Sequence, residues 1–184
     1  MSWKDVKANI NVTGFTPAQT KEIYDDFKDA YDNSDRAQEL FDQLSPTNQM
    51  DINFRSGAAF AAPVDGNYAG EGPLTRGVYF DPAVPPGLSI IDDTGTVGSF
   101  TQQYVLIHEA VHLIEGKEDL DAADRANGKH YTGFGDYLGD TERVTKEILD
   151  ELGVDMQRVS YDAAGPRSLM PLGTEYTGGE SIDN

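Results

Sequence analysis

Cysteine is absent from the 184 residues of this chain. The chain can therefore form no disulfide, has no thiolate nucleophile and cannot hold zinc through Cys ligands. Histidine occurs only 3 times, which restricts any imidazole site to few positions. The absence of cysteine does not indicate whether the protein works in a reducing or an oxidising compartment, because proteins without cysteine persist in both.

Basic side chains and long apolar runs are also scarce. The 14 Lys and Arg residues stand against 32 Asp and Glu residues, which gives a formal net charge of -18 at pH 7. Such a charge repels nucleic acids and anionic membranes, so neither is an expected partner. No apolar run approaches the roughly 20 residues that cross a bilayer, and residues 1–15 lack the apolar segment of a Sec signal peptide. We expect a soluble protein that stays in the cytoplasm or leaves it by a route other than Sec.

The composition nevertheless allows a folded core. With 38% hydrophobic and 10% aromatic residues, a chain of this length should bury about 70% of the surface that the unfolded chain exposes. We predict one domain over residues 1–161 and, as the oligomeric state, a monomer. Residues 162–184 are rich in Gly and Pro and show no hydrophobic periodicity, so we expect a loop-rich or partly disordered tail there.

Helices and strands are predicted on both sides of residue 100. A helix should begin after Thr16, a typical N-cap, because the apolar residues that follow recur at helical spacing, namely Ile23, Phe27, Ala30 and Tyr31. The other predicted elements are helices around residues 35–44 and 141–152 and strands at residues 8–12, 50–63 and 76–82, of which the last two should pair.

The stretch QQYVLIHEAVHLIEG, residues 102–116, contains the pattern His-Glu-x-x-His. On a helix a step of four residues advances about 400°, so His108 and His112 project from one face and can reach the same ion. Glu109 is close enough to deprotonate a zinc-bound water without being a ligand. Apolar flanks indicate a helix in the core, with Gly116 as its C-cap. We predict one Zn²⁺ on the two histidines with Glu109 as general base; the alternative is a pair of hydrogen-bonded core histidines.

The motif supplies two of the three protein ligands that a catalytic zinc usually takes. Metzincins place a Gly and a third His after the motif, but this chain has Glu115 and Glu118 at those positions. On the helix predicted from residue 141, Glu142 borders the apolar face, which makes it a candidate third ligand, as in gluzincins. The alternative for Glu142 is a first-turn residue that complements the helix dipole.

Other side chains compete for the position of third ligand. His130, in a glycine-rich loop, could bind zinc, donate a hydrogen bond to an oxyanion, or lie on the surface. Asp136, in TGFGDYLG, loosely resembles the Gly-Thr-x-x-Asp element of aspzincins with its first two residues reversed, and Asp119 is a further carboxylate. The residues alone leave the choice open.

In the order of these elements, the chain resembles the bacterial type III effector-like metallopeptidases, a zincin family. The resemblance rests on HEAVH, on TERVTKEILDELG and on the Arg-x-x-Tyr element RVSY, which together span residues 104–161. The chain departs from the family where Arg143 replaces the Asn of a Thr-Glu-Asn run and where a helical turn is inserted before Glu151. The resemblance suggests that Tyr161 approaches the site, where its hydroxyl could steady the oxyanion; the alternative is an aromatic ring packed under a loop.

These observations predict an α+β, zincin-like domain. A short mixed or antiparallel sheet should pack against the motif helix, with helices N-terminal and C-terminal to it. The expected function is that of a zinc metallopeptidase, an endopeptidase whose protein or peptide substrate binds along the edge strand at residues 58–62. The alternatives are a zincin-like binding module that no longer cleaves, and a metal-dependent enzyme that hydrolyses another amide or epimerises its substrate.

Overall fold

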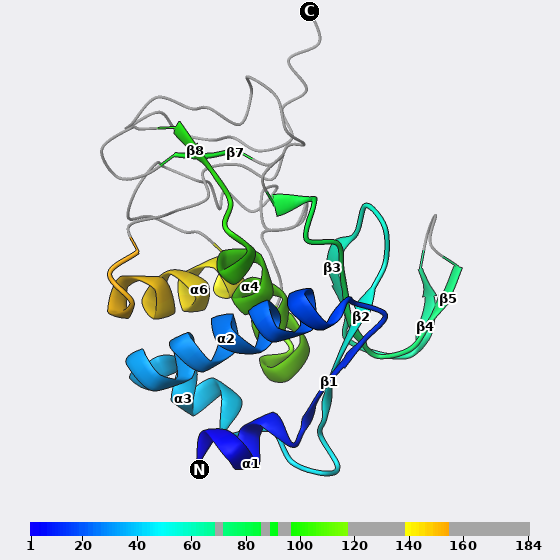
Figure 1. The fold of residues 1–184 in the computed structure, drawn as a ribbon, viewed down its shortest axis with the longest axis horizontal. Helices are drawn as coiled ribbons and strands as arrows, with labels where there is room; N and C mark the ends of the chain where they lie inside the picture. Colours follow the sequence, from blue (N-terminus) through cyan, green and yellow to red (C-terminus); the bar gives the residue numbers. More distant parts are fainter. Residues whose placement is uncertain (69–71, 86–88, 92–96, 118–138, 155–184) are drawn as a thin grey trace, which may run out of the picture.

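A computed structural model describes residues 1–68, 72–85, 89–91, 97–117 and 139–154 of the chain (Figure 1). The predicted boundary between domain and tail, after residue 161, lies outside the described residues and stays a prediction. The helices are α1 (Trp3–Lys7), α2 (Pro17–Asn33), α3 (Asp35–Phe41), α4 (Gln102–Glu115) and α6 (Asp140–Glu151). The strands are β1 (Ile10–Thr13), β2 (Met50–Phe54), β3 (Ala59–Ala62), β4 (Gly66–Tyr68), β5 (Gly72–Leu74), β6 (Gly77–Phe80), β7 (Ser89–Ile91) and β8 (Val97–Ser99).

The main sheet has 4 strands in the order β1-β2-β6-β3. β1 pairs with β2 and β2 pairs with β6 in parallel, whereas β3 runs antiparallel to β6. The predicted pairing of residues 50–63 with residues 76–82 is confirmed. The first of these segments divides into β2 and β3 at a turn where Gly57 has a positive φ of 75°. β4 with β5 and β7 with β8 form separate antiparallel pairs.

Helix α2 begins and buries its apolar face as the sequence predicts. The Thr16 hydroxyl accepts a hydrogen bond from the backbone N–H of Gln19 at 3.3 Å, and the Gln19 side chain accepts one from the backbone N–H of Thr16 at 3.0 Å. This capping box satisfies two backbone donors at the helix start. The buried side chains of the helix are Ile23, Phe27, Ala30 and Tyr31.

Helix α4 is the element on which the other layers pack. It contacts α2, α3 and α6 as well as β2, β3 and β6, and Figure 1 shows it between α6 and the main sheet. A single hydrophobic cluster joins it to these helices and to the sheet, with Phe27, Phe41 and Leu106 completely buried. The predicted α+β arrangement, with a short mixed sheet against the motif helix, is confirmed.

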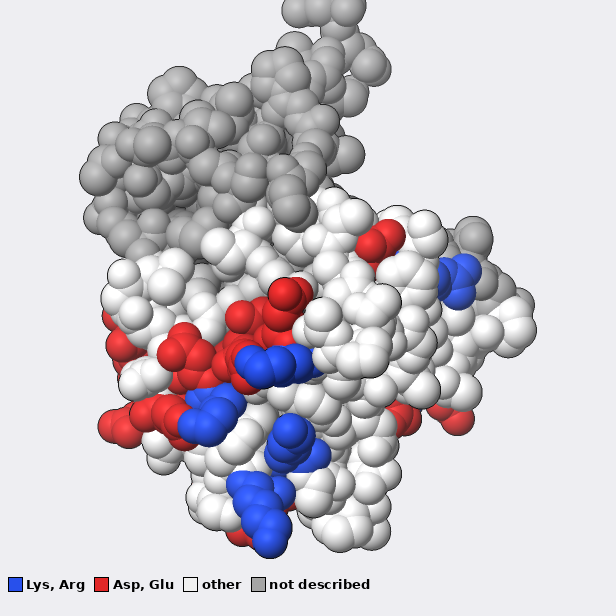
Figure 2. All heavy atoms as spheres, in the orientation of Figure 1, with Lys and Arg blue, Asp and Glu red and all other residues white. Residues whose placement is uncertain are grey.

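The helices carry much of their charge on their outer faces. Lys28 pairs with Asp32 in α2, and Lys146 pairs with Asp150 in α6 at 2.6 Å; Figure 2 shows acidic and basic groups interleaved over the helical side of the molecule. Exposed pairs four residues apart contribute only about 0.3–0.5 kcal/mol each, so the apolar core dominates stability. Among the described helices, none is long and apolar enough to cross a membrane.

Phe27→Ala should lower the free energy of unfolding by about 3–5 kcal/mol, because it removes a buried ring and leaves a cavity. The ring packs edge-on against Phe41, with the centroids 5.3 Å apart. Phe54→Ala is the control, and its loss should be smaller because Phe54 is 43% exposed. Urea unfolding followed by circular dichroism measures both losses. Equal losses in the two variants would show that Phe27 does not lie in the core.

Candidate metal centre

Caps at both ends of α4 fix how this helix presents its side chains. The Thr101 hydroxyl accepts a hydrogen bond from the backbone N–H of Tyr104 at 3.0 Å. At the other end, Gly116 adopts the left-handed conformation, with φ 63°. The predicted C-cap is therefore confirmed, and the motif occupies the middle of a helix whose two ends are both satisfied.

His108 and His112 converge on one point beside α4. Their Nε2 atoms lie 3.2 Å apart, and their ring planes meet at 84° with the centroids 4.8 Å apart. Two nitrogens bound to one tetrahedral zinc at about 2.0–2.1 Å would be separated by about 3.3 Å. The two side chains thus already have the separation that sharing one ion requires.

The outer edges of the two rings indicate which nitrogen carries the hydrogen. Nδ1 of His112 lies 2.7 Å from the carbonyl oxygen of Lys117, which can only accept, so Nδ1 is the donor. Nδ1 of His108 lies 3.5 Å from the hydroxyl oxygen of Thr145, whose own hydrogen is donated to the carbonyl oxygen of Thr141 at 2.9 Å. Imidazoles protonated on Nδ1 present the lone pair of Nε2. With the hydrogens assigned to Nδ1 on these contacts, the two Nε2 atoms face each other as acceptors.

Glu142 reaches the same cluster from α6. The carboxylate is only 2% exposed; its Oε2 accepts a hydrogen bond from the Tyr104 hydroxyl at 2.5 Å, and its Oε1 lies 3.6 Å from Nδ1 of His108. The structure therefore brings together all three residues predicted as ligands, but Glu142 meets His108 at the ring edge that does not face His112. Sequence reasoning missed Tyr104, although it precedes His108 by four residues and so shares its face of the helix.

Of the other residues predicted for the site, Glu109 is the one that lies within the described part of the chain. Glu109 is buried in α4, at 7% exposed. Within the part of the chain that the structure describes, no three His, Asp or Glu side chains form a group that could hold a metal ion. The third ligand and the oxyanion donor stay predictions, because four candidates lie outside the described residues: Asp119, His130, Asp136 and Tyr161.

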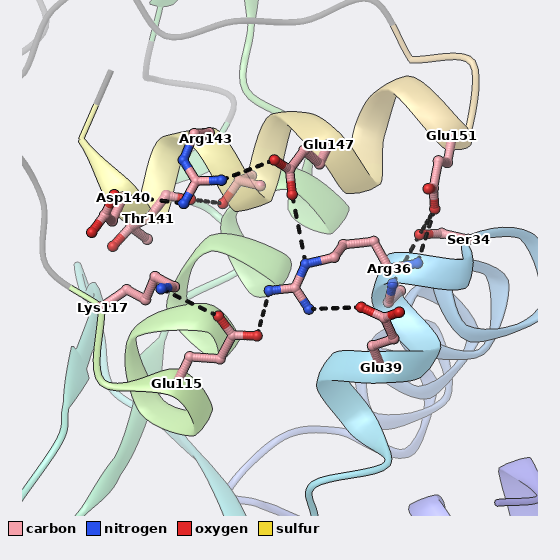
Figure 3. A network of polar contacts seen from close by, with 12 residues as sticks. Ser34, Arg36, Glu39, Glu115, Lys117, Asp140, Thr141, Arg143, Glu147 and Glu151 are labelled. Carbon is pink, nitrogen blue, oxygen red and sulfur yellow. Dashed lines mark hydrogen bonds and ion pairs between the residues drawn. The ribbon is translucent and has the colours of Figure 1, made fainter. Parts of the chain in front are cut away.

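An ion-pair network holds α6 against α4 (Figure 3). Arg36 of α3 contacts Glu115 at the end of α4, and it lies 3.8 Å from Glu39 and 3.6 Å from Glu147 of α6. The Arg36 and Glu115 side chains are only 19% and 12% exposed, so solvent screens this pair less than it screens surface pairs. Glu115, at the position of the metzincin Gly, thus belongs to the framework that positions α6.

Helix α6 is also fastened to the start of α3. The Glu151 carboxylate accepts hydrogen bonds from the Ser34 hydroxyl at 2.6 Å and from the backbone N–H of Arg36 at 3.0 Å. These bonds, with that of Ser34 the stronger influence, lower the pKa of Glu151 below its ordinary value of 4.5. Two contacts to α3 therefore hold the helix that delivers Glu142.

Comparison with known proteins bears on the fold. No protein-family model matches the sequence, and no curated protein matches it. Among solved structures, the crystal structure of the Salmonella zinc metalloprotease effector GtgA is similar, with a TM-score of 0.58 and 16% sequence identity over 88% of this chain and 84% of that chain. The likeness is one of fold: this chain and that protein share an α+β arrangement.

Glu151→Gln should weaken the dependence of stability on pH in acid. A carboxyl group whose pKa is lowered by folding stabilises the folded chain above its unfolded pKa, and this contribution is lost as the pH falls through the folded value. The free energy of unfolding of the variant should therefore change less between about pH 6 and about pH 3. Urea titrations across this range measure the slope, and Ser34→Ala should act in the same direction. A slope that neither variant alters would rule out this role for Glu151.

Proposed function

We propose that the chain is a zinc-dependent endopeptidase that hydrolyses peptide bonds with a Glu-activated water. The observation that carries the proposal is the 3.2 Å separation between Nε2 of His108 and Nε2 of His112. Both nitrogens are presented as acceptors beside a buried helix, and a shared cation relieves their repulsion. With Glu109 between them in the sequence, the donor set is that of the His-Glu-x-x-His zinc hydrolases.

The donors of this site suit zinc. Imidazole nitrogen is a preferred ligand of Zn²⁺, whereas Mg²⁺ and Ca²⁺ prefer oxygen. When bound, zinc supplies a Lewis acid that lowers the pKa of water and polarises a carbonyl group. His108 and His112 would hold it through Nε2. The sequence-based candidates for the third ligand are Glu142, His130, Asp136 and Asp119.

Glu109 is the proposed general base. Its carboxylate would accept the proton of the attacking water and deliver it to the amine nitrogen of the leaving peptide. Stabilisation of the oxyanion then requires a donor, for which Tyr161 is the prediction and His130 the alternative. The retained Glu109 favours an enzyme over a zincin-like binding module, because a module that only binds has no use for a general base.

The position of β3 supports a peptide substrate. In the described part of the main sheet β3 is one of the two terminal strands, and it packs beside α4. Ala59 and Ala61 pack against the main core cluster. An extended peptide can add to such an edge as a further strand. We infer that a protein or peptide substrate binds along residues 58–62, next to the motif helix.

The similarity to GtgA agrees with this chemistry. GtgA is described as a zinc metalloprotease effector. That description supports a peptidase reaction for this chain, and it supports an effector-like role in which the chain leaves the producing cell by a route other than Sec. At 16% identity the likeness extends only to the fold, so the paired histidines and not the comparison carry the proposal.

The purified chain should retain about one zinc ion per molecule, and His112→Ala should lose it, because one imidazole cannot hold the ion without its partner. Elemental analysis after dialysis measures the zinc content of both proteins. An apo wild-type protein that also fails to take up added zinc would refute the metal site.

Glu109→Gln should keep the zinc and lower the rate of peptide cleavage by about 10²–10⁴-fold, since the variant lacks only the proton acceptor. Cleavage of a proteome-derived peptide library, read by mass spectrometry, measures this loss. Glu22→Gln is the matched control, because Glu22 is exposed on α2, and it should keep both zinc and activity. Undiminished cleavage by Glu109→Gln would exclude the proposed base. A wild-type protein that binds zinc but cleaves nothing would favour the binding module.

A further inference from the structure

We propose that Glu142, held by Tyr104, positions His108 from its Nδ1 side and is not itself a metal ligand. This inference rests on the proposed zinc site and concerns one chain of contacts, from Tyr104 through Glu142 to His108. It gives Glu142 a different role from the one that its place on the predicted helix suggested.

The geometry separates the carboxylate from the point where the histidines converge. Oε1 of Glu142 lies 3.6 Å from Nδ1 of His108, whereas Nε2 of His108 faces Nε2 of His112 at 3.2 Å. Nδ1 and Nε2 lie on different edges of an imidazole ring. A carboxylate beside Nδ1 orients the ring and acts on an ion at Nε2 only through it.

The contact between Glu142 and His108 is strong because both side chains are buried. Tyr104, His108 and Glu142 are all buried, and a carboxylate out of water is unfavourable unless donors or positive charge compensate it. Tyr104 supplies one donor, with its hydroxyl 2.5 Å from Oε2 of Glu142. The Nδ1–H group of His108 supplies the facing positive edge, which becomes more positive when Nε2 binds a cation. Glu142 therefore favours the metal-bound form of His108.

The same contacts restrict the orientation of the His108 ring. The rings of Tyr104 and His108 are nearly parallel, at 10°, with the centroids 6.0 Å apart. The Thr145 hydroxyl oxygen lies 3.5 Å from Nδ1 of His108, on the edge that Glu142 also approaches. A ring held on its face and on its Nδ1 edge has little rotational freedom left to lose when Nε2 binds an ion.

Metal affinity and ligand-set spectroscopy of the full chain distinguish a positioning residue from a ligand. Zn²⁺ affinity is measured by competition with a chelator, and the ligand set is read from the visible absorption bands of the protein loaded with Co²⁺. For Glu142→Gln we expect unchanged Co²⁺ bands and an affinity lowered by about 10–100-fold, the usual effect of losing a carboxylate behind a His ligand. Tyr104→Phe should lower the affinity in the same direction, and the double variant should be no weaker than Glu142→Gln alone, because Tyr104 acts through Glu142.

Asp150→Asn is the matched control, because Asp150 is exposed on the same helix and pairs with Lys146 of that helix; the affinity and the bands of this variant should equal those of the wild type. Shifted bands in Glu142→Gln, with a loss far above about 100-fold, would make Glu142 a ligand and overturn the proposal. A lower unfolding temperature with unchanged affinity would make its role structural only, which also overturns it. If Glu142→Gln does not fold, the Zn²⁺ affinity and the Co²⁺ bands of Tyr104→Phe test the proposal in its place. A wild-type chain that binds neither ion would instead refute the zinc site itself.

Discussion

Two imidazole nitrogens that both present lone pairs lie 3.2 Å apart beside the buried helix α4. Such a contact is repulsive unless a proton or a cation lies between the nitrogens, and a proton would leave a charged imidazolium in the core. The surrounding groups strengthen this repulsion, because the backbone carbonyl of Lys117 and the hydroxyl of Thr145 present acceptor oxygens to the outer ring edges of His112 and His108. Glu142 adds negative charge at the edge of His108, which stabilises positive charge on the pair from behind.

The groups that create this constraint come from distant parts of the sequence. The histidines lie on α4, whereas Glu142 and Thr145 lie on α6, and α6 is oriented by contacts to Arg36 and Ser34 of a third segment. Neither α4 nor α6 can supply the site alone. The paired histidines therefore acquire their environment only when the core that joins these helices has formed, which couples the proposed metal site to the fold.

Features set by local periodicity could be predicted from the sequence. The capping residues Thr16 and Gly116, the buried stripe of α2 and the pairing of the strands around β6 depend on neighbours in sequence or on alternation, and the structure has them as predicted. The inward direction of Glu142 also followed from its place on the helical wheel. Which nitrogen of His108 it approaches did not, because that depends on how α6 is rotated against α4.

Other parts of the site were not predictable for a related reason. Across the interface between α4 and α6, Tyr104 contacts Glu142 and Thr145 contacts His108. The spacing of four residues places Tyr104 on the same helix face as His108, but it does not indicate which side chain of α6 the hydroxyl meets. The partner of Glu115 was equally hidden, because the ion pair with Arg36 joins residues that are 79 positions apart. The roles of Tyr104, Thr145 and Glu115 thus depend on contacts between helices, which the hydrophobic periodicity of the sequence does not indicate.

X-ray diffraction from crystals of the full chain, collected above and below the zinc absorption edge, tests the central claim most directly. We expect one anomalous peak within about 2.0–2.1 Å of Nε2 of both His108 and His112, with the Glu142 carboxylate at the Nδ1 edge of His108. Two imidazoles joined by a hydrogen bond, with no anomalous peak between them in crystals grown with zinc, would contradict it.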